Sequence, residues 1–318
     1  MDKLLRKLIS PVAVSGRETA VSEIIAELAA PYGEVVRDRM GNLVVHRPGF
    51  GRRIMVAAHM DSIGVMVTYI DEKGFARFAN LGGMQLVPMI GQRVRFESGV
   101  IGVISAERGV ELKELKPEHL FIDTAGEPVA IGDTAAFCAE PVFAGKKVIS
   151  PYLDNRLGCA VTLRAMELLK DTENEIFFVF TVQEEVGCRG ARPVAFTIQP
   201  DLAIAVDICG VPDTPCKKKP NALSLEGGPV IKIMDANVIA SPEIVSLLEQ
   251  AGEDMGVKTQ RLVTNAGGTD AGAIIGTRGG VPTGSLAIPI RYTHCPNEVG
   301  DLEVAENCAR LLAEAICR

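Results

Sequence analysis

The sequence predicts an α/β protein in which a mixed sheet is interrupted by a smaller β domain. Apolar runs with the length of buried strands alternate with helical periodicity in residues 1–63 and again in 150–318. Residues 64–149 instead carry short runs of alternating polarity between turn sequences, without a long helical pattern. We therefore expect one large domain formed by 1–63 and 150–318, with a β domain inserted at 64–149.

The individual elements are expected from their local patterns. Ser15 and Glu18 have the spacing of a capping box, and Ser241 with Pro242 forms an N-cap and first-turn pair. Helical periodicity is clearest in the stretches 18–30, 155–171, 241–255 and 304–317. Continuous apolar runs predict buried strands at 52–58, 175–182, 201–207 and 284–290.

Composition and charge exclude several classes of partner. The chain has 318 residues, 47% of them hydrophobic, and a net charge of −7 with acidic and basic residues interspersed, which argues against nucleic acid. No apolar run approaches the ~18 residues that span a membrane, and the N-terminal stretch resembles an amphipathic helix rather than a signal peptide. The eight cysteines, Cys216 among them, are expected as reduced thiols of a cytoplasmic protein.

Polar side chains follow the ends of the four buried strands. His59 follows the first strand, Glu184 and Glu185 the second, Asp207 the third and His294 the fourth. Open α/β sheets bind ligands beyond the carboxyl ends of their strands, so we expect these side chains to converge at one edge. Imidazole and carboxylate groups there are typical ligands of divalent cations.

The number of candidate ligands predicts two cations. With Asp154, at the start of a predicted helix, the set is His59, Asp154, Glu185, Asp207 and His294. Two imidazoles and three carboxylates exceed the four ligands of one tetrahedral zinc, and they suit two cations that share one carboxylate. Such a pair makes a bridging hydroxide available near neutral pH.

Further carboxylates are expected to act beside the cations. The side chains of Glu184 and Glu185 point apart if the backbone stays extended, so one can bind metal while the other acts as general base. Asp61, two residues after His59, is expected to accept a hydrogen bond from the second ring nitrogen of that histidine and so fix its tautomer.

At these residues the sequence resembles the M42 metallo-aminopeptidases of the MH clan, also called glutamyl aminopeptidase or TET-type peptidases, some of them labelled endoglucanase M. The match covers nearly the whole chain in order. The motifs that carry it are "AAHMDSIG" (57–64), "LGGMQLVPMIGQRV" (81–94), "LDNRLGCA" (153–160), "VQEEVGCRGA" (182–191), "AVDICGVPDTP" (205–215), "GGTDAGAI" (267–274) and "GVPTGSLAIPIRYTHCPNEV" (280–299).

The resemblance implies a role for each candidate residue. Asp154 would bridge two divalent ions, Zn²⁺ or Co²⁺ with Mn²⁺ as a further option. Glu185 and His294 would complete the coordination of one ion, and His59 and Asp207 that of the other. Glu184 would be the general base and Asp61 would orient His59. The implied reaction is removal of the N-terminal residue from a short peptide.

The resemblance also implies an architecture and an assembly. The fold would be a zinc-peptidase domain of the phosphorylase/hydrolase-like type, with a β-barrel or PDZ-like dimerisation domain inserted. Family members form shells of twelve subunits. The segment 121–133 is shorter here than in relatives. A homo-oligomer between a dimer and a dodecamer is therefore expected.

Alternatives to an aminopeptidase remain open at this point. Carboxypeptidases and N-acyl amino-acid deacylases of the same clan use a similar site. A glycosidase is disfavoured because the chain has no Trp and only 5% aromatic residues for binding sugars. An inactive binding protein is disfavoured because the sequence contains all five candidate metal ligands and the candidate general base. The roles of Asp270 and Arg291 are left open, since each could contact substrate or only stabilise the fold.

Overall fold

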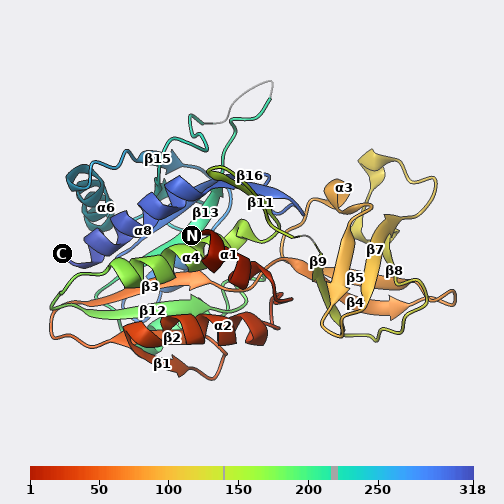
Figure 1. Ribbon diagram of the computed structural model, residues 1–318, viewed down its shortest axis with the longest axis horizontal. Coiled ribbons are helices and arrows are strands. Elements are labelled where there is room, and N and C mark those ends of the chain that lie inside the picture. Colours follow the sequence, from red (N-terminus) through yellow and green to blue (C-terminus); the bar gives the residue numbers. More distant parts are fainter. Residues whose placement is uncertain (139, 216–220) are drawn as a thin grey trace.

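The computed structural model describes residues 1–138, 140–215 and 221–318. A large α/β unit contains both ends of the chain, and a β-barrel lies beside it, at the right of Figure 1. The predicted fold class, an α/β fold with a mixed sheet and a separate small barrel, is confirmed.

An 11-stranded sheet forms the centre of the large unit. Its main path is β1-β2-β12-β3-β13-β16-β17-β11-β10, and β14 and β15 extend from β16. Strands β12, β3, β13 and β16 are neighbours and run parallel, whereas the flanking strands are antiparallel. The bounds are β1 Glu34–Arg37, β2 Leu43–Arg47, β3 Arg53–His59, β10 Val142–Ala144, β11 Lys147–Ser150, β12 Glu175–Thr181, β13 Leu202–Gly210, β14 Val230–Met234, β15 Gln260–Val263, β16 Thr283–Arg291 and β17 Glu298–Asp301.

Helices cover both faces of this sheet, which explains why its central strands are apolar throughout. Ile54 and Val56 of β3 belong to the core shared with α4 and α8. The alternate residues Met55 and Ala57 pack with α5 and α7 on the opposite face. The helices are α1 Asp2–Ile9, α2 Thr19–Ala29, α4 Leu153–Leu168, α5 Ala191–Ile198, α6 Pro242–Asp254, α7 Asp270–Ile275 and α8 Leu302–Ile316.

The expected capping box before α2 is wrong. The N-cap residue is Glu18, and no side chain caps the helix. The Ser15 hydroxyl donates instead to Asp61 at 2.6 Å, and Glu18 Oε1 accepts from the amides of Gly16 and Gln183. Tertiary partners therefore replace the local cap, and they attach the start of α2 to the strand ends.

The second unit is a closed barrel with the strand order β4-β5-β8-β7-β6-β9. Alternate side chains fill its interior, among them Val65, Phe78 and Ile104. Its strands are β4 Gly64–Ile70, β5 Ala76–Leu81, β6 Arg93–Phe96, β7 Ile101–Ala106, β8 Leu120–Asp123 and β9 Thr134–Phe137, with the short helix α3 Leu86–Met89 between β5 and β6.

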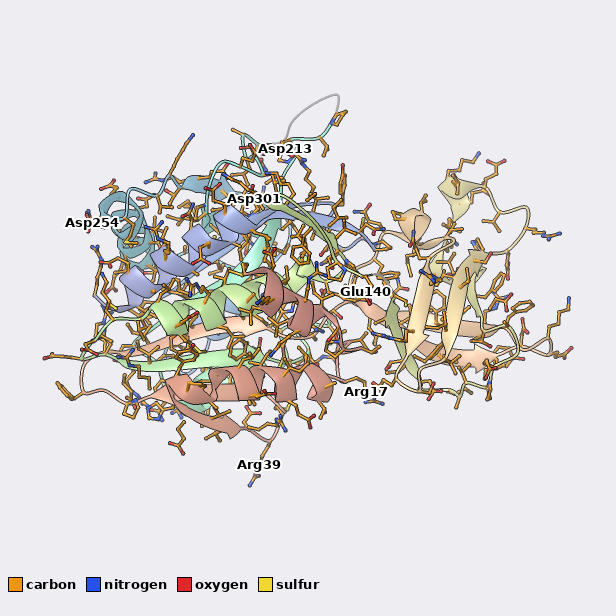
Figure 2. The ribbon with its side chains drawn as sticks, in the orientation of Figure 1. Arg17, Arg39, Glu140, Asp213, Asp254 and Asp301 are labelled. Carbon is orange, nitrogen blue, oxygen red and sulfur yellow. The ribbon has the colours of Figure 1, made fainter. Side chains whose placement is uncertain are left out.

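The chain returns to the large sheet before residue 149. Strand β10 lies inside the predicted insertion and β11 begins there, yet β10 pairs with β11 and β11 pairs with β17 of the large sheet. Arg95 of the barrel donates to the Ser10 carbonyl at 2.7 Å, and Arg17 lies 3.7 Å from Glu97. Figure 2 shows Arg17 beside this junction of the two units.

Two expectations concern membranes and disulfides. Among the residues that the structure describes, no helix is long and apolar enough to cross a membrane. The seven cysteines within the described ranges are free thiols. Cys216 lies outside the described residues.

Candidate metal centre

Neighbouring parallel strands bring the first candidate ligands to one edge of the sheet. Ala57 of β3 is paired with Ala205 of β13, so His59 and Asp207, each two residues further on, lie side by side. His59 Nε2 is 3.6 Å from Asp207 Oδ1. On the other side of β3, strand β12 ends at Thr181 opposite His59, and this places the following turn at the same edge.

Two groups of ligand atoms meet at this edge, and Asp154 belongs to both. One group is His59, Asp154 and Asp207, and the other is Asp154, Glu185 and His294. Asp154 Oδ1 lies 3.2 Å from His59 Nε2, while Asp154 Oδ2 lies 3.2 Å from His294 Nε2. The structure thus brings all five predicted ligands together, with one carboxylate between two groups.

The donor atoms fit two cations in type and spacing. Two ligands about 2.1 Å from a tetrahedral ion are about 3.4 Å apart, and the nitrogen–oxygen distances within the groups run from 3.2 to 3.6 Å. Glu185 Oε1 is buried without a hydrogen-bond partner among the described residues. A carboxylate oxygen buried in this way is costly unless a cation or a proton meets it.

Three carboxylates and two imidazoles make up the cluster, and burial and mutual contacts shift the pKa values of several of its members. Burial opposes protonation of His59, but hydrogen bonds to Asp154 and Asp207 raise its pKa well above the usual range. At His294 burial is again opposed by a hydrogen bond to Asp154, and the pKa is raised. Burial, together with the charge of Asp154, raises the pKa of Glu185 well above its usual range. Divalent cations would supply the charge that protons supply here.

Asp61 connects the candidate ligands to the candidate base. His59 Nδ1 lies 3.2 Å from the backbone oxygen of Asp61 and 3.5 Å from its Oδ1, which leaves Nε2 facing the cluster. The same carboxylate accepts from the amides of Glu184 and Glu185 at 3.0 and 3.2 Å. Asp61 therefore holds both glutamates as well as the imidazole, which goes beyond its predicted contact with His59.

Sequence reasoning missed Glu298. This fully buried carboxylate accepts from the Asp154 amide through Oε2 and from the His294 amide through Oε1, both at 3.0 Å. It thereby fixes the backbones of two ligands that are far apart in sequence. Its sequence signals were its position four residues after His294 and its place within the motif at 280–299.

Glu184 lies outside both ligand groups. The backbone is not extended there, because Gln183 has a left-handed φ of 56° and a turn follows. Glu184 Oε1 accepts from the Cys188 thiol at 3.2 Å, and Asp270 is the third member of this cluster. Burial raises the pKa of Glu184 to about 8 and that of Asp270 to about 7.

A cavity of about 540 Å³ opens onto both ligand groups and onto Glu184. The ammonium-bearing side chain of Lys232 lines its wall, although only 7% of that residue is exposed. Gly83, from the segment after β5, lines it too, and a Cβ there would lie 3.1 Å from His294 Nδ1. A lysine within the otherwise apolar stretch "VIKIM" was the sequence signal for Lys232.

The two residues left open in sequence acquire structural partners. Arg291 makes a two-pronged ion pair with Asp213, at 2.6 and 3.0 Å. Thr269 caps α7 by accepting from the Ala271 amide, so the glycines at 267 and 268 lead into a capped helix that begins at Asp270. Asp270 Oδ2 accepts from the Thr181 hydroxyl, while its Oδ1 has no partner among the described residues.

Comparison with known proteins places this site in a family. A profile for M42 glutamyl aminopeptidase matches residues 41–311. A provisionally named aminopeptidase of Acetivibrio thermocellus is 46% identical over 100% of this chain and 98% of its own.

Solved structures agree with this assignment. An aminopeptidase from the archaeon Desulfurococcus kamchatkensis superposes with a TM-score of 0.94 at 35% identity, over 99% of this chain and 93% of its own. The TET1 peptidase of Pyrococcus horikoshii, which assembles into a tetrahedron or a large octahedral shell, gives 0.88 at 31% identity over 99% and 98%. The chain therefore belongs to the M42 glutamyl aminopeptidase family and is a peptide-bond hydrolase of the aminopeptidase type.

Proposed function

We propose that this aminopeptidase removes the N-terminal residue of short peptides with the help of two divalent cations. The supporting observation is the position of Asp154, whose two oxygens face different groups of ligand atoms. His59 and Asp207 would complete one cation site, and Glu185 and His294 the other. Zn²⁺ and Co²⁺ suit these ligands best, with Mn²⁺ as a further option. When bound, the cations would polarise the scissile carbonyl and lower the pKa of a water molecule.

Glu184 is proposed as the general base. It lines the cavity but belongs to neither group of cation ligands, so its carboxylate is free to exchange a proton. It would take a proton from the attacking water and deliver it to the amine that leaves. Asp61 is proposed as the residue that positions this base, because it accepts from the Glu184 amide.

Lys232 points to the class of substrate. Its side chain makes no hydrogen bond or ion pair among the described residues, although it is buried in the cavity wall. Its positive charge therefore faces the cavity without a counter-ion among the described residues, and a substrate carboxylate would pair with it there. We propose that peptides with an N-terminal Glu or Asp are preferred.

Aminoacyl reporters test this preference. Glutamyl and aspartyl reporters should be cleaved faster than leucyl or lysyl ones, and Lys232→Met should lower kcat/KM for the glutamyl reporter roughly ten- to a hundredfold. Lys232→Arg keeps the charge and serves as the matched control. An unchanged preference in Lys232→Met would remove this residue from substrate recognition.

The same lysine in the cavity wall supports one second candidate. A same-clan carboxypeptidase or N-acyl amino-acid deacylase would use Lys232 to hold the free carboxylate of its substrate. Comparing peptides that have a free amine with N-acylated amino acids separates the two. Preference for the blocked amine would favour the second candidate over an aminopeptidase.

The experiment for the reaction itself is Glu184→Gln. This variant should lose about 100-fold or more of kcat while it keeps two cations per chain, as measured by metal analysis of the purified protein. Chelation should abolish wild-type activity, and Zn²⁺ or Co²⁺ should restore it. Full turnover by Glu184→Gln would show that another group moves the proton.

Assembly and location are proposed from separate observations. The related TET1 peptidase forms shells, and the barrel of this chain carries exposed apolar side chains on β7, Ile101 and Val103. We propose a homo-oligomer in which the barrel is a contact surface. The free thiols of the described cysteines agree with the reducing cytoplasm.

A further inference from the structure

A third group of potential ligands lies beside the two already described. Glu184, Cys188 and Asp270 each offer one ligand atom, and these atoms lie within 4.8 Å of one another. The turn after β12 holds the first two together, since the Cys188 amide donates to the Glu184 carbonyl at 2.9 Å. None of the three forms an ion pair among the described residues, and none belongs to the two groups around Asp154.

Asp270 independently indicates that a ligand is missing from this cluster. The residue is 3% exposed, and its Oδ1 is buried without a hydrogen-bond partner among the described residues. Only Oδ2 is satisfied, by the Thr181 hydroxyl. A buried carboxylate oxygen with no partner is costly, and a cation bound between Asp270 and Cys188 would remove that cost.

The cluster can be reached from the active-site cavity. Glu184 and Cys188 line the cavity wall, whereas Asp270 is buried behind them. A cation that entered with solvent would therefore contact the thiol and the Glu184 carboxylate first. The Cys188 thiol would release its proton to solvent on binding, and a water molecule from the cavity would fill the remaining position.

We propose that Glu184, Cys188 and Asp270 form a third cation site, which binds thiophilic divalent ions and inhibits the enzyme. One sulfur and two oxygen ligands favour Zn²⁺ or Cd²⁺ over Mg²⁺, which prefers oxygen ligands alone. Inhibition follows from the proposed function, because Glu184 cannot both ligate this ion and act as general base. Excess zinc would thus stop the reaction at a site distinct from the two ions that support it.

Cobalt titration detects the site without relying on turnover. Thiolate bound to Co²⁺ absorbs strongly in the near ultraviolet, whereas the oxygen and nitrogen ligands around Asp154 do not. A third equivalent of Co²⁺ added to the two-ion protein should produce this band, and Cys188→Ser should abolish it. Cys209→Ser is the matched control, because Cys209 lines the same cavity without nearby ligand partners, and it should keep the band.

Inhibition is measured in parallel with excess Zn²⁺ and, as a comparison, Mg²⁺. Relative to its own uninhibited rate, Cys188→Ser should need at least about tenfold more Zn²⁺ for half-inhibition, and Asp270→Asn should shift in the same direction. A cobalt band that persists in Cys188→Ser, or no third equivalent at all, would overturn the site. A cobalt band without inhibition by excess Zn²⁺ would mean that the third site exists but does not inhibit. That outcome would contradict the role of Glu184 as general base.

Discussion

At the scale of single residues, four hydrogen-bond donors converge on Asp61. They are the Ser15 hydroxyl, the amides of Glu184 and Glu185, and the Nδ1 side of His59. The carboxylate accepts from the hydroxyl and from both amides, whereas His59 Nδ1 contacts the Asp61 backbone oxygen at 3.2 Å and lies 3.5 Å from Oδ1. An asparagine of the same size would present an amide donor toward at least one of the three donors. The negative charge of Asp61 is therefore expected to be as important for these contacts as the size of its side chain.

We expect Asp61→Asn to weaken cation binding roughly 10- to 100-fold, because the charged carboxylate 3.5 Å from the ligand imidazole becomes neutral. The measurement is a competition between the protein and a chelator of known affinity, and kcat should fall with it. Ser15→Ala, which removes one donor and leaves the carboxylate, should change the affinity far less. Equal effects of the two substitutions would mean that Asp61 acts only through local packing.

Four of the five ligands could be predicted because they come at or just after the end of an apolar run, as His59 and Asp207 do, whereas Asp154 lies at the start of a helix. Glu298 and Lys232 could not be predicted, since their importance depends on partners from distant segments. Glu298 accepts hydrogen bonds from the amides of Asp154 and His294, and Lys232 lies largely buried in the cavity wall. Local signals mark the two residues, a lysine in an apolar run and a glutamate four residues after His294, but they do not indicate these distant partners.

At the scale of elements, a buried arginine attaches the N-terminal helix to α4. Arg156 is fully buried, and it donates to the carbonyls of Leu8 and Ala13 at 2.6 and 2.8 Å. These contacts join α1 and the following segment to the helix that carries Asp154. The strands themselves were predictable from apolar runs, but this attachment was not, because an arginine in a helical pattern is ordinarily expected on the surface.

Arg156→Met should lower the free energy of unfolding by about 2–5 kcal/mol, because the Leu8 carbonyl loses the arginine as donor and the Ala13 carbonyl keeps only the Ser62 hydroxyl. Urea denaturation followed by circular dichroism measures the change. Arg164→Met in the same helix is the control: its ion pairs with Glu167 and Glu306 lie near the surface, so about 1 kcal/mol or less is expected. A similar loss in both variants would contradict a special role of the buried group.

At the scale of the whole molecule, the barrel surface is expected to mediate assembly. Ile101 and Val103 point outward on β7 and are 41% and 39% exposed. Apolar side chains grouped on one strand suggest a contact surface more strongly than isolated ones do. The change of sequence texture after residue 63 predicted a separate β domain, and the family resemblance implied that it is a barrel. Its closure and the return of β10 and β11 to the large sheet depend on strand pairing that local patterns do not encode.

The double variant Ile101→Glu with Val103→Glu should give a smaller species in sedimentation velocity, because paired carboxylates cannot be buried at an interface. Hydrolysis of a single aminoacyl reporter should persist, since neither side chain lines the cavity. Phe50→Glu, at an 87% exposed position in the large unit, is the control and should leave the size unchanged. An unaltered sedimentation coefficient in the double variant would assign assembly to another surface.

The barrel leaves and rejoins the large unit on either side of the reaction centre. His59 ends the strand that leads into it, and Asp154 begins the helix that follows the return through β11. Gly83, within the inserted segment, also touches the cavity. Replacing the barrel by another domain would therefore also change residues that line the cavity and the chain segments that hold His59 and Asp154. Substrate specificity and subunit assembly are thus expected to change together.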